Sequence, residues 1–186
     1  MFKPADLSIA EERSLAYDGN KSDSTSWRPV GIELYEGERG EKMKPLRLRG
    51  HHLLCVHGFR GMGYSPSFVE KMWEIVARIR DENDDFPIEV VAALDEACLV
   101  CPHHGETTCE AGPDSDAHVR SLDGNVIRHL GLEPGSVYWK SELIQRTAER
   151  VKPDDLDELC RGCSWLPYGV CKEGIANVRR GNVAQT

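Results

Sequence analysis

A cysteine motif that occurs twice places the strongest constraint on how this chain folds. Residues 94–109 read LDEACLVCPHHGETTC, and residues 156–171 read LDELCRGCSWLPYGVC. Both segments have the form L-D-E-x-C-x2-C-x7-C, and together they contain six of the seven cysteines. The repeated unit is a binding motif, because two copies are too few to stack into a solenoid. We therefore expect a fold organised around bound metal.

Cysteines in this pattern are ligands for a soft metal. Thiolate ligands select zinc, Cu(I) or iron–sulfur clusters over magnesium or calcium. Zinc sites usually combine two close pairs separated by roughly 15–20 residues, whereas here 58 residues separate Cys101 from Cys160 and each pair carries a third cysteine. Three cysteines in one unit suit three corners of a cubane cluster. We predict an iron–sulfur cluster of the 4Fe-4S type, with zinc as the alternative, ligated by the repeat cysteines Cys98, Cys101, Cys109, Cys160, Cys163 and Cys171.

The seventh cysteine, Cys55, ends the segment RGHHLLC. If this segment is helical, His51 and His52 share a face with Cys55. Cys55 is then a candidate fourth ligand for one triad, and His51 or His52, or else His103 or His104, is a candidate for the other. The alternatives are a buried free thiol at Cys55, histidines that serve only for capping and core hydrogen bonds, and one cluster whose fourth iron stays open.

Two arrangements of the repeat are open. Each copy can hold its own centre, or the two C-x2-C pairs can converge on a shared one. We favour one centre per copy, with Cys55 near one of them, because both copies keep the third cysteine, which a shared four-cysteine site would not need. The acidic pairs at 95–96 and 157–158 are expected to cap the cysteine turns. Trp165 and Tyr168 are expected to shield a cluster from water.

Composition excludes several other classes of protein. The 23 Lys and Arg against 31 Asp and Glu give a net charge of −8, which argues against a nucleic-acid binder because phosphate contacts need clustered basic charge. No apolar run approaches the ~18 residues of a membrane-spanning helix, and the N-terminus lacks the apolar stretch of a signal peptide. Cysteine-rich chains without an export signal are typical of a reducing compartment. We therefore expect a cytoplasmic protein that binds neither nucleic acid nor membrane.

The chain divides into two parts of different character. Residues 1–42 are polar and rich in glycine, so we expect a disordered N-terminal extension, with a short strand at 31–35. Residues 43–186 are expected to form a cysteine-rich metal-binding domain. There the patterns predict strands at 46–48 and 88–94, helices at 51–59, 66–80, 114–130 and 137–151, and a last short helix from Pro153 to Cys160. The predicted fold class is α+β, a small, mixed, helix-rich domain with a few short strands.

A resemblance to a known family is carried by the segments RLRGHHLLCVHGFRGMGYSPSFVEKM, LDEACLVCP and ELCRGCSWLPYGVC. They resemble the DUF1284 family, small bacterial and archaeal proteins of unknown function. The resemblance covers roughly residues 45–172, and the family's cysteines correspond to all seven cysteines of this chain. It implies iron–sulfur cluster binding, and it implies no particular reaction.

Three functions fit these observations. The favoured one is an iron–sulfur protein that carries electrons or senses oxidants together with a redox partner protein, because the thiolates exceed the four that one zinc ion uses. The second is a zinc-binding structural module. The third is a desulfidase-like enzyme with an open-site three-cysteine cluster, which needs a polar pocket beside the open iron. Candidates for that pocket are Arg49, His51, His52 and Arg60.

Overall fold

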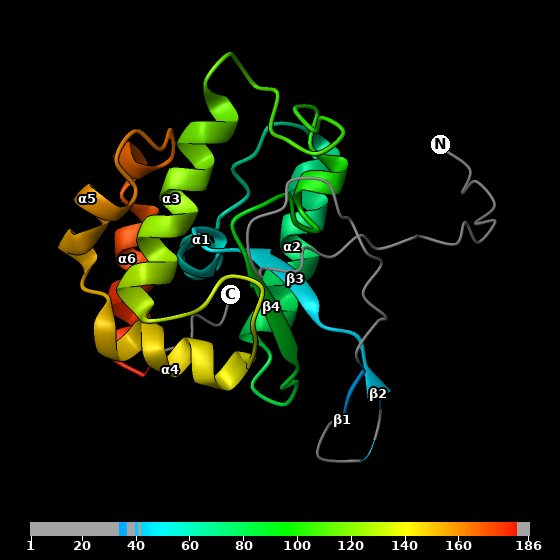
Figure 1. Cartoon of the computed structure of the whole chain (residues 1–186). Coiled ribbons are helices and arrows are strands. Elements are labelled where there is room, and N and C mark those ends of the chain that lie inside the picture. The colour runs from blue at the N-terminus through cyan, green and yellow to red at the C-terminus, as the bar shows by residue number, and fades with distance from the viewer. Residues whose placement is uncertain (1–33, 37–39, 41, 182–186) are drawn as a thin grey trace, which may run out of the picture. The chain divides into compact units, whose positions relative to one another are not determined.

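Two small sheets and six α-helices make up the part of the chain that the structure describes, residues 34–36, 40 and 42–181 of a computed structural model (Figure 1). Strand β1 (Tyr35–Glu36) pairs antiparallel with β2 (Lys42–Met43). In the second sheet β4 (Pro87–Val91) lies between β3 (Leu46–Arg49), to which it is parallel, and β5 (Val137–Trp139), to which it is antiparallel. The fold class is α+β, as predicted.

The helices are arranged around the three-stranded sheet and around one another. They are α1 (His52–Gly58), α2 (Pro66–Arg80), α3 (Ser115–Leu130), α4 (Lys140–Arg150), α5 (Leu156–Leu159) and α6 (Val170–Arg179), with the 3₁₀ turns η1 (Cys98–Val100), η2 (Pro153–Asp155) and η3 (Leu166–Tyr168). Helix α2 begins as its sequence predicts, because the Ser65 side chain accepts a hydrogen bond from the Phe68 amide at 3.1 Å. No helix in the described residues is long and apolar enough to cross a membrane.

Several elements differ from the sequence prediction. The strand predicted over 88–94 ends already at Val91. The helix predicted over 137–151 begins only at Lys140, because the β-branched and aromatic residues before it pair with β4 as strand β5. The helix after Pro153 is not the last one, since α6 follows it and buries Cys171, Ile175 and Val178 at helical spacing. Of the strand predicted at 31–35, residues 31–33 lie outside the described residues, and Tyr35 belongs to β1.

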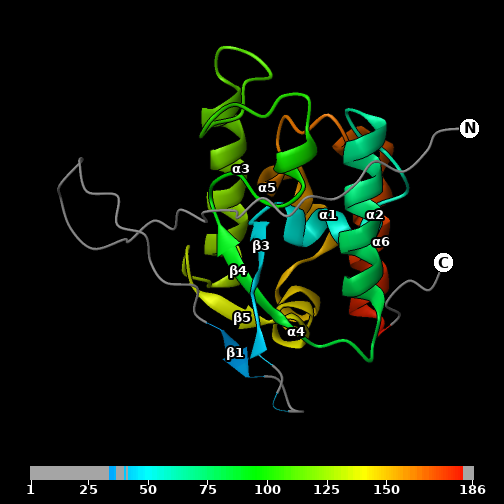
Figure 2. The ribbon, with the colours of Figure 1, turned by 90° about the vertical axis from the view of Figure 1, so that its right-hand side faces the viewer.

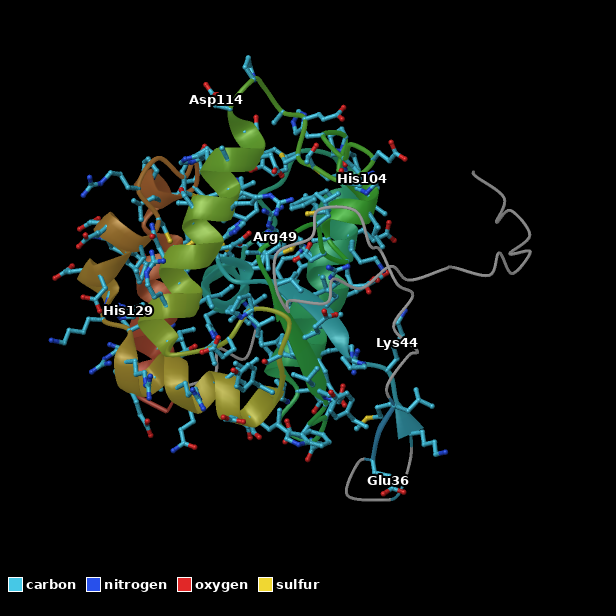
Figure 3. All side chains as sticks on the ribbon, viewed as in Figure 1. Glu36, Lys44, Arg49, His104, Asp114 and His129 are labelled. Carbon is cyan, nitrogen blue, oxygen red and sulfur yellow. The ribbon has the colours of Figure 1, made fainter. Side chains whose placement is uncertain are left out.

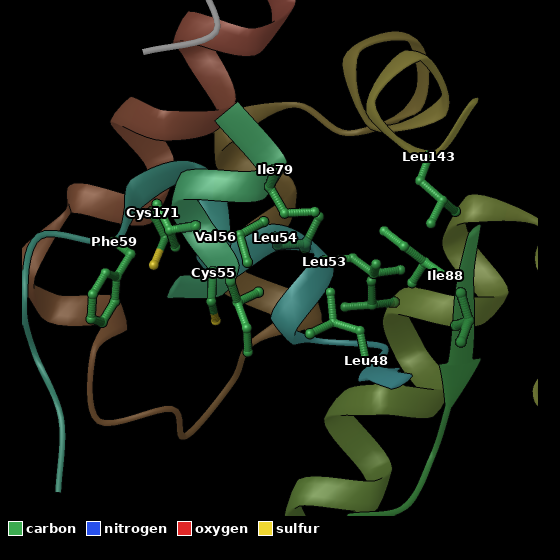
Figure 4. Packing of buried hydrophobic residues seen from close by; sticks show 14 of the residues in the cluster. Leu48, Leu53, Leu54, Cys55, Val56, Phe59, Ile79, Ile88, Leu143 and Cys171 are labelled. Atoms are coloured by element: carbon green, nitrogen blue, oxygen red, sulfur yellow. The ribbon is translucent and has the colours of Figure 1, made fainter. Parts of the chain in front are cut away.

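Helix α1 lies at the centre of this arrangement, between α6, α2 and strand β3 (Figures 1 and 2). All its residues are buried. It approaches α6 so closely that a Cβ at Gly58 would lie 2.6 Å from the Cα of Cys171, and one at Gly174 would lie 2.5 Å from the backbone nitrogen of Gly58. The two helices therefore touch backbone to backbone, which brings Cys55 on α1 beside Cys171 on α6 (Figure 4).

This contact predicts the effect of a single methyl group. Gly58→Ala should lower the free energy of unfolding by about 1–3 kcal/mol, because the new Cβ forces α1 away from α6. Gly124→Ala is the matched control, since a Cβ there would meet nothing within 4 Å, and in mid-helix it should stabilise by about 0.5–1 kcal/mol. Urea unfolding of both variants measures the difference. Equal effects would show that the helices have room to separate.

Candidate metal centre

The two C-x2-C pairs are closed by the same backbone hydrogen bond. The Cys101 amide donates to the carbonyl of Cys98 at 3.0 Å, and the Cys163 amide donates to the carbonyl of Cys160 at 2.9 Å. A second turn follows in each copy, in which the amide three residues after the second cysteine donates to that cysteine's carbonyl, at 3.0 and 3.2 Å. The first pair forms the 3₁₀ turn η1, whereas the second uses the left-handed conformation of Gly162, at φ +83°. The two copies therefore share a hydrogen-bond pattern and differ in turn type.

The third cysteines of the two copies lie in different structures. Cys109 returns to the first turn through a β-bridge with His104, and its amide donates to Asp116 Oδ1 at 3.0 Å. Cys171 lies instead in the first turn of α6. All seven cysteines are free thiols, and those of Cys55, Cys160 and Cys171 are buried. The x7 segment therefore closes as a loop in the first copy and becomes the start of a helix in the second.

Cys55 on α1 lies beside Cys171 on α6, as Figure 4 shows, and Cys163 and Cys160 of the second copy are near enough to act on its charge. Cys55 donates a hydrogen bond to Cys171, which raises the pKa of the Cys55 thiol well above its usual value, and burial raises it further. Cys171, Cys163 and Cys160 add to this effect because their negative charge would repel a thiolate at Cys55. Burial raises the pKa of Cys160 to about 12, with a contribution from Cys163 and Cys171. We call these four residues the four-cysteine set.

The remaining thiols, Cys98, Cys101 and Cys109, all belong to the first copy of the repeat, and we call them the three-cysteine set. The pKa of Cys101 is raised by burial and by the nearby Cys109 and Asp95, while a hydrogen bond from the His103 backbone acts against the rise. Backbone N–H groups that donate to sulfur tune the potential of iron–sulfur sites. Burial and Asp95 raise the pKa of Cys98 to about 12.

A buried ionic network extends from Arg49, which Figure 3 labels, to Cys98 of the three-cysteine set. The Arg49 guanidinium, whose side chain is 3% exposed, donates from Nε to Asp123 Oδ2 at 2.9 Å and from Nη1 to the Cys98 sulfur at 3.8 Å. Its Nη2 lies 2.8 Å from the same Asp123 oxygen and forms a buried ion pair with it. Asp123 therefore neutralises Arg49, and Nη1 is the nitrogen that faces the Cys98 sulfur.

The two adjacent histidines are each anchored by a carboxylate. His51 Nδ1 lies 2.6 Å from Asp123 Oδ1, and His52 Nδ1 lies 2.6 Å from Asp95 Oδ2. Burial lowers the pKa of His51, and the neighbouring His52 adds to the effect. Burial alone would raise the pKa of Asp123, but His51 and Arg49 outweigh it and hold the pKa below its usual value. This matches the core hydrogen-bonding role considered from the sequence, and it leaves only Nε2 of each ring for a ligand.

Aromatic side chains cover the second cysteine loop unequally. Trp165 is 7% exposed and packs against Phe59 and Phe68, as a shielding residue should. Tyr168 is 66% exposed, so it shields nothing in the structure described, contrary to expectation. Of the first loop's histidines, His103 contacts Tyr64 edge-on and His104 is exposed.

Sequence reasoning missed Asp123 and Tyr64. Asp123 had a detectable signal, because it lies one turn before Val126 and Ile127 on the apolar face of α3, where an unpaired acid would be costly. Tyr64 had none, because it precedes α2 in a loop and its neighbours come from distant segments.

The donor set fits a thiolate-bound cofactor. Within residues 34–36, 40 and 42–181, no three His, Cys, Asp or Glu side chains are already placed to hold a metal ion. The thiols are nevertheless gathered in two sets, and soft sulfur donors of this number suit zinc or iron–sulfur chemistry. The positive charge of Arg49, which reaches the Cys98 sulfur through Nη1, is compatible with a thiolate at Cys98.

The two copies of the repeat offer a matched pair of substitutions. Asp95, whose side chain is fully buried, accepts hydrogen bonds from the amides of Arg49, Ala97 and Cys98, whereas Asp157, 63% exposed, binds only Lys172. Asp95→Ala should lower the free energy of unfolding by about 3 kcal/mol, because it leaves buried partners unpaired. Asp157→Ala should cost at most about 0.5 kcal/mol. Similar costs in urea unfolding would contradict the network.

The raised pKa of Cys160 predicts a pH dependence for the metal-free protein. A thiol whose pKa is about 12 when folded and 9.0 when unfolded stabilises the fold below pH 9, and this contribution is lost as the pH rises towards 12. The cost of Cys160→Ala should therefore shrink by about 1 kcal/mol between pH 8 and pH 10. Urea unfolding of both proteins under reducing conditions measures this change, since other titrations cancel in the difference. A constant cost would place Cys160 in contact with solvent.

Comparison with known proteins gives one match. The family described as Protein of unknown function (DUF1284) matches residues 63–169, which is more than half of the chain. The matched stretch contains both C-x2-C turns and Cys109, while Cys55 and Cys171 lie outside it. No curated protein and no solved structure matches the chain. The shared sequence around both cysteine turns makes this chain a member of the DUF1284 family.

Proposed function

We propose that this chain is an iron–sulfur protein with two centres, one in each copy of the cysteine repeat. The proposal is supported by the two copies of the cysteine repeat, each with three free thiols, and by Cys55, which lies on α1 against α6 and beside Cys171 of the second copy. Cys55, from a segment outside the repeat, joins Cys160, Cys163 and Cys171. Four thiolates complete the ligation of a 4Fe-4S cluster, and three leave one iron to another ligand. The cofactor would supply one-electron chemistry, which suits electron transfer or oxidant sensing.

The surroundings of the two sets support a cluster over zinc alone. A structural zinc ion takes four ligands, so one zinc leaves three cysteines unexplained. The pKa of Cys101 is raised by Cys109 of the same copy, and the pKa of Cys160 by Cys163 and Cys171 of its own copy, which supports one centre per copy over a shared site. Hydrogen-bond donors at sulfur, such as the His103 backbone and Arg49, and burial under Trp165 are the features that tune cluster potentials.

An enzyme with an open-site three-cysteine cluster remains a second candidate, because no fourth cysteine joins Cys98, Cys101 and Cys109 in the described residues. Arg49 and the His51–Asp123 pair lie beside this set, as a polar pocket for a small substrate requires. Arg60 does not contribute to that pocket, since its exposed side chain pairs with Glu173. For either candidate we propose a cytoplasmic protein, because free thiols persist in a reducing compartment, and for electron transfer a redox partner protein.

The test is metal analysis of the full chain, expressed with added iron and purified without oxygen. The wild-type protein should be brown and contain iron and acid-labile sulfide. Cys55→Ser and Cys171→Ser should each remove roughly half of the iron, because both disable the four-cysteine set, and Cys109→Ser should remove the other half.

Double variants provide the control. Cys55→Ser with Cys171→Ser should lose no more iron than either change alone, whereas Cys55→Ser with Cys109→Ser should lose nearly all of it. Stoichiometric zinc without sulfide in the wild-type protein would instead establish the zinc module. Loss of all the metal from Cys109→Ser alone would indicate one shared centre.

A further inference from the structure

The side chain of Tyr64 lies between the two cysteine loops. Its ring is stacked on Trp165 of the second loop, with centroids 5.9 Å apart and an interplanar angle of 27°. The same ring meets His103 of the first loop edge-on at 5.4 Å. Both contacts belong to the x7 segments, which directly follow Cys101 and Cys163. The Tyr64 ring thus contacts the segment that follows each of the two C-x2-C turns.

The side chain of Tyr64 is half exposed, with a relative exposure of 51%. Burial of the rest raises its pKa, a hydrogen bond with Ser164 acts against the rise, and the charges of the nearby Cys163, Cys55 and Cys101 raise the pKa further. Cys101 belongs to the three-cysteine set, and the other two belong to the four-cysteine set. The N-terminus of α2, which follows Tyr64, also contacts the first C-x2-C turn, because Ser67 Oγ donates a hydrogen bond to the Val100 carbonyl at 3.3 Å.

We infer that Tyr64 is a positioning residue that couples the two cysteine sets, so that metal in one set raises the affinity of the other. The inference rests on the proposed function to the extent that both sets bind metal. Metal in the first set fixes the loop that carries His103, which fixes the ring of Tyr64. The fixed ring in turn holds Trp165 and Ser164 in place beside Cys163. The four-cysteine set then binds metal at a lower entropy cost, because its loop is already ordered. By thermodynamic linkage, metal in the four-cysteine set raises the affinity of the three-cysteine set by the same factor.

The test uses the metal-free, reduced full chain and cobalt(II) alone as the probe. Each cysteine's protection from alkylation is read peptide by peptide by mass spectrometry, so the two sets are followed separately. Cys109→Ser disables the three-cysteine set without touching the four-cysteine set. In an otherwise wild-type chain, Cys109→Ser should raise about fivefold the cobalt concentration at which half of Cys160 and Cys163 is protected from alkylation. Cys55→Ser should weaken protection of Cys98 and Cys101 by the same factor.

Two substitutions of Tyr64 identify the coupling residue. In the Tyr64→Ala background, Cys109→Ser should shift half-protection of Cys160 and Cys163 by less than about twofold, because the ring contacts are gone. Tyr64→Phe keeps the ring and loses only the hydrogen bond with Ser164, so most of the coupling should remain. Circular dichroism of each variant checks that the fold is retained.

The outcomes separate the inference from the proposed function. An equal shift in the Tyr64→Ala and wild-type backgrounds, or no shift in either, overturns the coupling role of Tyr64. Cobalt that protects neither set in the wild-type chain overturns metal binding altogether, and the proposed function with it. Coupled cobalt binding in a protein that takes up no iron and sulfide supports the role of Tyr64 and leaves zinc as the resident metal.

Discussion

The backbone contact between α1 and α6 is the constraint on which the rest of the structure depends. Gly58 and Gly174 lie where the two backbones meet. A Cβ at Gly58 would lie 2.6 Å from the Cα of Cys171, and one at Gly174 would lie 2.5 Å from the backbone nitrogen of Gly58, so either would clash. This approach buries the whole of α1 and places Cys55 in hydrogen-bonding contact with Cys171. A larger residue at either glycine would separate the helices, and the four-cysteine set would lose the thiol that comes from outside the repeat.

The short segment from Arg49 to Cys55 links the two thiol sets. Arg49 ends strand β3 and reaches Cys98, while Cys55 lies on α1 among the thiols of the second copy. Between them, the carboxylates of Asp95 and Asp123 hold His52 and His51 and so fix the turn from strand to helix. Buried charges of this kind are tolerated only when paired. The network therefore ties the first cysteine turn, strand β3 and helix α3 into one rigid support.

The two copies of the repeat share a turn but not an environment. The first turn is capped by the buried Asp95 and lies beside Arg49, so its thiols are surrounded by charge and hydrogen-bond donors. The second turn relies on Gly162, its thiol partners are Cys163 and Cys171, and the buried Trp165 follows it in the chain. Such a difference suits two centres of unlike character. The four-cysteine set has a fourth thiol from Cys55. The three-cysteine set has charged side chains close to the position of a fourth ligand.

The sequence by itself determined the start of α2 at Pro66 and the positions of strands β3 and β4, because short-range hydrogen bonds and residue periodicity decide these elements. One centre for each copy of the repeat stays a prediction. The sequence left open which copy receives Cys55, and it missed α6, Asp123 and Tyr64. Those features depend on contacts between segments far apart in the chain, such as Gly58 with Gly174 and Tyr64 with Trp165. Only tertiary packing decides them, because steric fit between distant surfaces leaves no periodic pattern in the sequence.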